Sequence, residues 1–188
     1  MKNKLQELIA RGPVFAAVKD DGDLEEALHS DCTVIFLLYG TICNVGSLVK
    51  KVKEAGKVCF VHADLIEGLA LKETAAQFLS ENTEAEGIIS TKLAVIRAAK
   101  ERGLMTVHRC FLLDSKSLEA FIRQLSAEEA DCVEVLPGVM PKVIRRVVEA
   151  SKVPVIAGGL ISDKEDAMTT LSAGADGIST TCRAVWGS

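Results

Sequence analysis

The stretch that decides the fold is VPVIAGGLISDKEDAMTTLSAGADGISTT, residues 153–181. It opens with an apolar run, breaks at the glycine pair 158–159, continues through a polar segment, and closes with the short run DGIST. Ser162 with a glutamate three residues later has capping-box spacing and predicts a helix start, and Gly174 predicts the helix end. A strand, a helix and a second strand in this order predict one unit of a parallel sheet.

The same alternation runs through the whole chain. Short apolar runs rich in β-branched residues predict strands at residues 14–18, 33–38, 57–62, 86–90, 104–108, 132–136, 153–157 and 176–180. The segments between them predict helices at residues 23–30, 44–55, 68–79, 91–102, 115–127, 138–151 and 163–173. Eight strands in this rhythm predict an α/β fold, a compact (β/α)8 barrel of the TIM type, with an open doubly wound sheet as the alternative.

The chain length constrains the ends of this barrel. The 188 residues fit one barrel domain spanning residues 1–188, although such barrels usually have at least ~200 residues. Only residues 183–188 follow the last strand, so the last helix is expected to be truncated to a turn or missing. We hypothesise that the N-terminal segment LQELIA, residues 5–10, covers either that gap or the barrel floor.

Composition and charge exclude several classes of protein. A hydrophobic content of 48% excludes a disordered chain, and no apolar run reaches the roughly 18–20 residues that span a bilayer. The N-terminus lacks a signal-peptide pattern, so a cytoplasmic location without membrane contact is expected. The six cysteines show no CxxC pair and no zinc spacing, which favours buried reduced thiols. A net charge of −4 does not favour nucleic-acid binding.

Glycines and hydroxyls at the ends of the last two strands predict a phosphate site. Active sites of (β/α)8 barrels lie at the carboxyl ends of the strands, and the last two loops often bind phosphate. Glycine lets backbone N–H groups approach an anion, and hydroxyls add donors. The predicted cradle comprises Gly158, Gly159, Ser179 and Thr180. The alternative interpretation is a tight turn followed by helix-capping hydroxyls.

Polar residues at the other strand ends complete a predicted small-ligand pocket. They are Lys19, His62, Asp64, Lys92, Arg109 and Glu134. His62 and Asp64 share strand parity and are expected to point to one side. Glu134 lies in an apolar run and needs a partner, for which the three cationic residues are candidates. Each charge could instead be a solvated strand end or a structural ion pair. No nucleophile motif, metal-ligand spacing or Walker loop is present, so no catalytic residue, metal ion or cofactor is predicted.

Taken in order, the strand-end motifs resemble the GlpP family of glycerol uptake operon antiterminator regulatory proteins. The matching motifs are PVFAAVKD, HADLIEGL, EGIISTK, HRCFLLDS, VEVLPGVMPK, PVIAGGLISDKED and ADGISTT, which cover nearly the whole chain. The resemblance implies a cytoplasmic barrel that is not an enzyme. It implies an effector, glycerol 3-phosphate, and a partner, the leader mRNA of glycerol-utilisation genes, whose premature termination the protein prevents. The phosphate would then lie on the predicted cradle and the glycerol end near His62, Asp64 and Glu134.

The RNA-binding surface is left open by the sequence. Basic residues cluster on three helix candidates, as Lys50-Lys51-Lys53-Lys57, Arg97-Lys100-Arg102 and Lys142-Arg145-Arg146. Each cluster could be an ordinary solvated face, and a homodimer could combine such patches. Two other functional classes stay open: an isomerase, aldolase or lyase acting on a small phosphorylated metabolite, and a phosphate-binding barrel without an RNA role.

Overall fold

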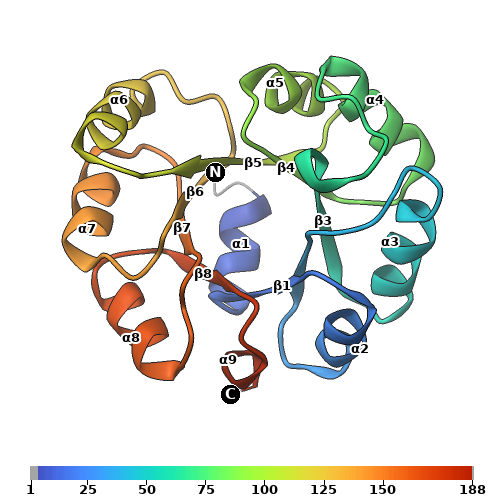
Figure 1. The fold of residues 1–188 in the computed structure, drawn as a ribbon, viewed down its shortest axis with the longest axis horizontal. Coiled ribbons are helices and arrows are strands. Elements are labelled where there is room, and N and C mark those ends of the chain that lie inside the picture. The colour runs from blue at the N-terminus through green and yellow to red at the C-terminus, as the bar shows by residue number, and fades with distance from the viewer. Residues whose placement is uncertain (1–3, 188) are drawn as a thin grey trace.

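The computed structural model describes residues 4–187, which form a closed barrel of eight parallel strands (Figure 1). The strands are β1 (Val14–Val18), β2 (Val34–Leu37), β3 (Val58–His62), β4 (Gly87–Ser90), β5 (Met105–Phe111), β6 (Cys132–Leu136), β7 (Val155–Gly158) and β8 (Gly177–Thr180). The barrel closes because β8 pairs in parallel with β1, with Phe15 opposite Ser179. This closure confirms the predicted TIM-type barrel and excludes the open sheet. Residues 1–3 and 188 of the predicted domain range lie outside the described part.

Helices alternate with the strands around the barrel. They are α1 (Lys4–Arg11), α2 (Asp21–His29), α3 (Val45–Glu54), α4 (Glu73–Asn82), α5 (Leu93–Glu101), α6 (Ser115–Leu125), α7 (Pro141–Ala150), α8 (Lys164–Ser172) and α9 (Arg183–Trp186), with a 3-10 turn, η1 (Ala63–Leu65). The largest departure from prediction is α4, which begins at Glu73 instead of residue 68. Gly68 has a left-handed φ of 83°, so the chain turns there before the helix can start.

Local capping explains two smaller shifts in helix starts. Helix α2 begins at Asp21 because the Asp20 side chain accepts a hydrogen bond from the Asp23 backbone N–H over 2.8 Å. The N-cap of α8 is Asp163, which accepts from the Asp166 N–H over 2.8 Å, and not Ser162 as the spacing suggested. Gly174, which was predicted to end this helix, follows it with a left-handed φ of 107°.

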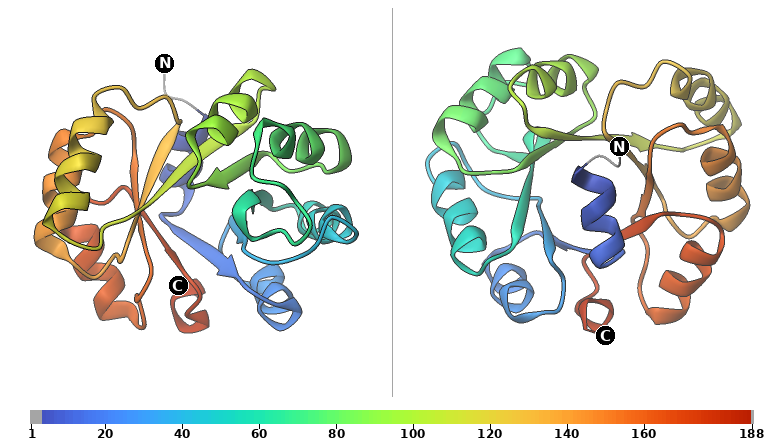
Figure 2. Two further views of the ribbon diagram at one scale, coloured as in Figure 1. Left: turned by 45° about the horizontal axis from the view of Figure 1, so that its top comes forward. Right: turned by 180° about the vertical axis from the view of Figure 1, so that it is seen from behind.

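Alternate residues of the strands fill the barrel, and α1 closes its floor. Phe15, Phe36 and Phe60 stack inside, with ring centroids 5.2 and 5.5 Å apart. Leu5 and Leu8 of α1 belong to the same buried cluster. Seen from behind, α1 lies across the end of the barrel (Figure 2, right). The hypothesis that the N-terminal segment covers the barrel floor is therefore confirmed.

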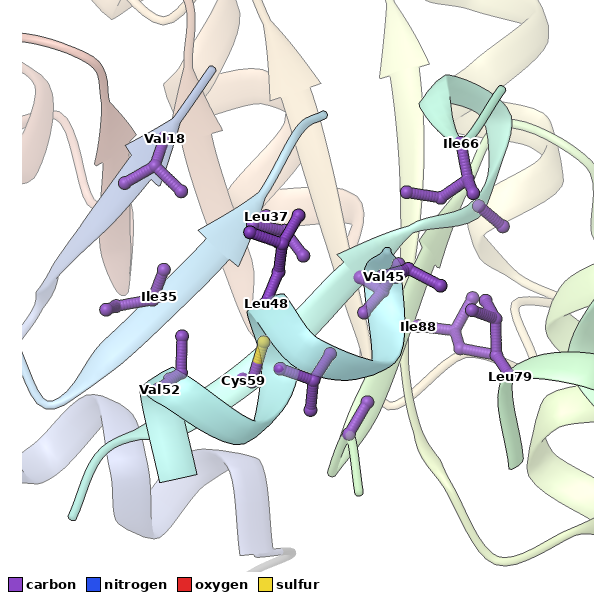
Figure 3. Close-up of a cluster of buried hydrophobic side chains, with 14 of the residues drawn as sticks. Val18, Ile35, Leu37, Val45, Leu48, Val52, Cys59, Ile66, Leu79 and Ile88 are labelled. Atoms are coloured by element: carbon purple, nitrogen blue, oxygen red, sulfur yellow. The ribbon is translucent and has the colours of Figure 1, made fainter. Parts of the chain in front are cut away.

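The remaining strand residues point outward and pack under the helices. Figure 3 shows one such cluster, in which Leu37 and Cys59 of the strands meet Leu48 and Val52 of α3. Full burial of an aliphatic side chain contributes about 1.5–3 kcal/mol to stability. Both faces of the sheet are therefore covered by packed apolar side chains.

The last helix is truncated, as predicted, to the four residues of α9. Trp186 is 3% exposed and donates an indole hydrogen bond to the Thr180 carbonyl over 2.8 Å. Arg183 donates through Nε to the buried Asp23 carboxylate over 2.9 Å. One turn thus replaces a full helix because a large aromatic side chain and an ion pair anchor it.

Among residues 4–187, no helix has both the length and the apolar character required to cross a bilayer. The six cysteines are free thiols, as expected. The prediction that they are buried holds for Cys32, Cys59 and Cys132, whereas Cys110 and Cys182 are half-buried and Cys43, in the loop after β2, is exposed.

Candidate functional site

A buried ion pair lies at the carboxyl end of the barrel interior. Arg109 and Glu134 are paired neighbours on β5 and β6. Nε of Arg109 donates to Oε2 of Glu134 over 2.5 Å, and the two residues are 6% and 0% exposed. The Ser179 hydroxyl, from β8, donates to the other carboxylate oxygen, Oε1. Of the three cationic candidates for Glu134, the structure therefore selects Arg109.

Gly158 makes this arrangement possible. A Cβ atom on Gly158 would lie 2.3 Å from Oγ of Ser179 and 2.8 Å from Oε1 of Glu134. Both distances are shorter than van der Waals contact, so any side chain would separate the two polar groups. Gly158 thus leaves the space in which Ser179 and Glu134 meet. Gly159, the second glycine of the pair, lines the cavity at the barrel mouth.

A cavity of about 190 Å³ lies above the ion pair. Its lining residues are Ala17, Leu38, Arg109, Leu136, Gly159, Leu160, Ile161, Ser179, Thr180 and Thr181. Gly159 has a left-handed φ of 77°, and a Cβ there would approach Leu136 to 3.1 Å. This volume is below the ~300–1,000 Å³ usual for drug-sized ligands, so the cavity fits a small molecule.

The cavity carries several unused hydrogen-bond donors. Within residues 4–187, the backbone N–H groups of Gly159 and Thr181 donate no hydrogen bond. Only Nε of Arg109 is engaged by Glu134, so the Nη donors of its guanidinium are also unpaired among the described residues. A guanidinium and free backbone N–H groups recognise an anion. The apolar residues Leu38 and Leu136 form the walls and suit a short carbon chain.

The two hydroxyls predicted for the cradle have different environments. Ser179 points inward and donates to Glu134, which leaves its oxygen lone pairs available to a ligand donor. The Thr180 hydroxyl donates to the Ile161 carbonyl over 2.8 Å and accepts from the Cys182 N–H over 3.0 Å. Thr180 therefore holds the β7–α8 loop against the turn after β8, which fits the alternative interpretation of a capping hydroxyl.

His62 lies inside the barrel at the end of β3. It is 3% exposed, and its Nδ1 atom has no hydrogen-bond partner within residues 4–187. Burial, followed by the positive charge of Arg109, lowers the His62 pKa to about 4. The neutral ring can donate to or accept from a polar group, although the cavity lining does not include it.

Strand parity, which predicted that His62 and Asp64 point to one side, does not apply to Asp64, because Asp64 lies beyond the end of the strand. β3 ends at His62, and Asp64 belongs to the 3-10 turn η1, where strand alternation no longer applies. Its carboxylate accepts from the Ser90 hydroxyl over 2.6 Å and from the Thr91 N–H over 3.0 Å. Burial alone would raise the Asp64 pKa, but these hydrogen bonds outweigh burial and lower it. Asp64 thus fastens the end of β3 to the end of β4.

Lys19 and Lys92 lie on the rim and not in the cavity. Both are exposed, and neither has an ion-pair partner among the described residues. Strand-end position alone could not separate these exposed lysines from the buried Arg109.

Sequence reasoning missed the apolar lining and Thr181. Ala17, Leu38 and Leu136 have the inward parity of their strands, which is the only signal that could have identified them. Leu160 is 73% exposed and has an unusual left-handed φ of 61°, directly after Gly159. Such backbone strain is typical of functional loops. Among the described residues, no group of three or more His, Cys, Asp or Glu side chains could hold a metal ion.

Comparisons with known proteins support a family assignment. A family model described as glycerol-3-phosphate responsive antiterminator matches residues 14–186. The uncharacterized protein YgcP of Escherichia coli (strain K12) is 47% identical over 182 residues, which cover 97% of this chain and 95% of that protein.

Two solved structures are similar to the chain in both sequence and fold. The glycerol uptake operon antiterminator regulatory protein of Listeria monocytogenes str. 4b F2365 is 30% identical, with a TM-score of 0.88 and coverage of 93% of this chain and 95% of that one. A glycerol uptake operon antiterminator-related protein of Thermotoga maritima MSB8 is 37% identical, with a TM-score of 0.81 and coverage of 92% and 96%.

Proposed function

The chain belongs to the family of glycerol-3-phosphate responsive antiterminators, and we propose that it binds glycerol 3-phosphate at the barrel mouth and, in response, the leader mRNA of glycerol-utilisation genes. The observation that carries the ligand part is the small cavity in which the Arg109 guanidinium and the free N–H groups of Gly159 and Thr181 converge. In this role the barrel is a regulator and not an enzyme.

The cavity suits both ends of the proposed ligand. The phosphate would accept hydrogen bonds from the Nη groups of Arg109 and from the N–H groups of Gly159 and Thr181. A glycerol hydroxyl would donate to Ser179, whose own proton is directed at Glu134. His62, with its unpaired Nδ1, is the candidate partner for the second hydroxyl. Glu134 would orient Arg109 and Ser179 from below without touching the ligand.

The runner-up function is an isomerase, aldolase or lyase acting on a small phosphorylated metabolite. A buried, neutral His62 beside the ion pair is the one observation in its favour. Against it, Lys19 and Lys92 lie outside the cavity lining, so the lining supplies no amine for a covalent intermediate with a carbonyl substrate. Family membership also favours the regulatory role.

Isothermal titration of the purified protein tests the ligand assignment. Glycerol 3-phosphate is expected to bind selectively and without turnover, while glycerol and inorganic phosphate, which each present only half of the required groups, bind weakly or not at all. The replacement Gly159→Asp places a carboxylate at the phosphate position and is expected to abolish binding.

Gly103→Asp is the matched control for this variant. Gly103 has a left-handed φ of 75°, close to the 77° of Gly159, but nothing lies within 4 Å of its Cβ position, and it lies far from the mouth at the end of α5. It imposes the same backbone strain without blocking the cavity. Unchanged affinity in Gly159→Asp, or turnover of the ligand by the wild-type protein, would contradict the proposed function.

A regulator of this kind acts on nascent RNA in the cytoplasm, which is the location we propose. A homodimer would double the RNA-contacting surface, and light scattering of the purified protein with and without glycerol 3-phosphate tests that arrangement.

A further inference from the structure

Three of the four lysines in the basic cluster on α3 and the loop after it already have partners within the protein. Lys53 forms an ion pair with Glu86. Nζ of Lys57 donates to the carbonyl oxygens of Ser30 and Cys32 over 2.7 and 2.6 Å. Lys50 lies 3.8 Å from Glu54, one helical turn away. These three lysines hold α3 and its neighbouring loops in place. Lys51 is the lysine of this cluster that is exposed and has no ion pair or side-chain hydrogen bond within residues 4–187.

Two of the three cations in the basic cluster on α5 pair with carboxylates. Arg97 contacts Glu129 over 3.1 Å, and Lys100 contacts Asp131 over 3.4 Å. The third cation, Arg102, donates to the Ala98 carbonyl over 3.1 Å. Cations that already pair with carboxylates would have to exchange these partners for phosphates, which reduces the gain from binding an anionic chain.

The basic cluster on helix α7 differs from the clusters on α3 and α5 because its cations have no partners among the described residues. Lys142, Arg145 and Arg146 are exposed, and none of them has an ion pair or side-chain hydrogen bond within residues 4–187. Their spacing of three and four residues places them on one face of the helix, with neighbouring Cβ atoms about 5–6 Å apart. Glu149 is the one acidic residue of α7; it shares this face, but it lies beyond ion-pair distance of the two arginines.

A groove continues this face toward α8. Its volume is about 570 Å³, and it is lined by Pro141 and Arg145 of α7 and by Glu165, Met168, Thr169, Ser172 and Ala173. The hydroxyls of Thr169 and Ser172 can donate to phosphate oxygens, as Ser and Thr commonly do on nucleic acids. Met168 is exposed there and offers an apolar contact to a base.

We propose that the exposed face of α7, with the groove between α7 and α8, is the surface that contacts RNA. The inference rests on the proposed function and specifies the surface that the function uses. Phosphate contacts by unpaired Lys and Arg dominate the affinity of proteins for nucleic acids. Among the three basic clusters, the one on α7 has every cation without an ion pair or side-chain hydrogen bond within residues 4–187, whereas the α3 cluster has Lys51 alone in that state. Polar groups also lie beside the α7 cations.

This surface is physically joined to the ligand site. The Gly138 N–H, in the loop before α7, donates to the carbonyl oxygen of Gly159 over 3.0 Å. The Thr170 hydroxyl of α8 donates to the Gly138 carbonyl over 3.0 Å. A ligand that binds the Gly159 N–H would therefore affect the loop before α7 through the hydrogen bond between Gly138 and Gly159. This chain of contacts would allow ligand binding to change the affinity for RNA.

Binding to two RNA probes tests the proposal. The probes are a labelled transcript of a glycerol-utilisation leader and a short labelled single-stranded RNA pool of random sequence, both measured by fluorescence anisotropy with saturating glycerol 3-phosphate. The triple variant Lys142→Gln/Arg145→Gln/Arg146→Gln is expected to lose roughly ten- to hundredfold in affinity at physiological salt, and the slope of log K against log salt is expected to fall by about 2, because three phosphate contacts are removed.

A matched control removes the same charge elsewhere. Lys50→Gln/Lys51→Gln/Arg102→Gln neutralises three exposed cations of α3 and α5 and is expected to bind RNA like the wild type. Glu149→Gln is expected to tighten binding a few-fold. Thermal melting and glycerol 3-phosphate titration of the α7 variant, both expected to match the wild type, exclude misfolding.

Two outcomes overturn the proposal and are distinguishable. If the wild type binds RNA but the α7 variant binds equally well with the same salt slope, the surface assignment alone is wrong. If the wild type binds neither probe with or without glycerol 3-phosphate, the RNA part of the proposed function fails and the surface assignment fails with it.

Discussion

Nε of Arg109 lies 2.5 Å from Oε2 of Glu134 in the interior of the barrel, and both side chains are almost completely shielded from solvent. The two residues lie side by side on β5 and β6. Charges are costly to bury unless they are paired and hydrogen-bonded, and the Ser179 hydroxyl supplies a further bond to this carboxylate. The pair therefore presents a fixed guanidinium to the cavity without leaving an uncompensated charge.

Breaking this pair is expected to destabilise the protein strongly. Glu134→Ala or Arg109→Ala should each lower the free energy of unfolding by about 3–5 kcal/mol, because the remaining charge stays buried without a partner. The double variant Arg109→Met/Glu134→Leu should cost much less than the sum of the single variants. Denaturant unfolding measures all three. Additive losses would show that the two residues do not depend on each other.

Gly158→Ala is expected to damage the same network by steric overlap. The new Cβ would lie 2.3 Å from Oγ of Ser179, so the strand or the serine must move, at a cost of about 1–3 kcal/mol. In a Ser179→Ala background this closest contact is removed, and Gly158→Ala should cost less than in the wild type. A double-mutant cycle by thermal unfolding measures the difference. Equal costs in both backgrounds would contradict this explanation of the glycine.

The stability of the protein is expected to fall as the pH falls from about 6.5 to about 4. Burial and Arg109 lower the pKa of His62 to about 4, so the unfolded chain takes up a proton on this residue at higher pH than the folded chain. A lowered histidine pKa thus gives stability that is present near neutral pH and lost on acidification, by roughly 3 kcal/mol in total.

Urea unfolding across this pH range checks the contribution of His62. His62→Asn should flatten the dependence, whereas His29→Asn, at an exposed position of α2, should leave it unchanged. Asp64 and Glu128 also have lowered pKa values, and the stability they contribute is lost as the pH falls through their ordinary values of 3.8 and 4.5, at the acidic end of the His62 window. If His62→Asn left the pH dependence of the free energy of unfolding unchanged, the attribution of that dependence to His62 would be wrong.

Trp186 is expected to hold the seam between β8 and β1 that the truncated α9 covers. Trp186→Ala should destabilise the protein by about 3–5 kcal/mol, and Trp186→Phe by about 1 kcal/mol through loss of the hydrogen bond to the Thr180 carbonyl. Chemical unfolding followed by circular dichroism measures both. Phe111→Ala, which removes a half-exposed aromatic side chain, is the control and should change little.

Much of the architecture was predictable from local pattern. The alternation of β-branched apolar runs with helical segments identified the eight strands, because a strand buried on both faces must be apolar throughout. The short C-terminal remainder predicted the truncated last helix. The start of α4 was missed because the positive φ of Gly68 and the turn η1 are set by packing between the β2 and β3 loops, where Ile42 contacts the Gly68 position.

The candidate site was predicted only as a set of strand ends. The sequence indicated that Arg109, Glu134 and Ser179 would gather at one end of the barrel. It did not distinguish Arg109 from Lys19 and Lys92 as the partner of Glu134, because strand position does not reveal which long side chain reaches inward. It also treated Gly158 and Gly159 alike, although one permits close packing and the other faces the cavity.

The sequence by itself therefore determined the fold class, the order of the strands and the edge at which polar groups collect, because all three depend on periodicity along the chain. The tertiary structure decided which of those groups meet. Arg109 and Glu134 are 25 positions apart in the sequence and meet because β5 pairs with β6. Glu134 and Ser179 are 45 positions apart and meet inside the barrel from β6 and β8. Tertiary packing also decides which basic helix keeps unpaired charge, since the ion pair between Arg97 and Glu129 joins α5 to the loop before β6.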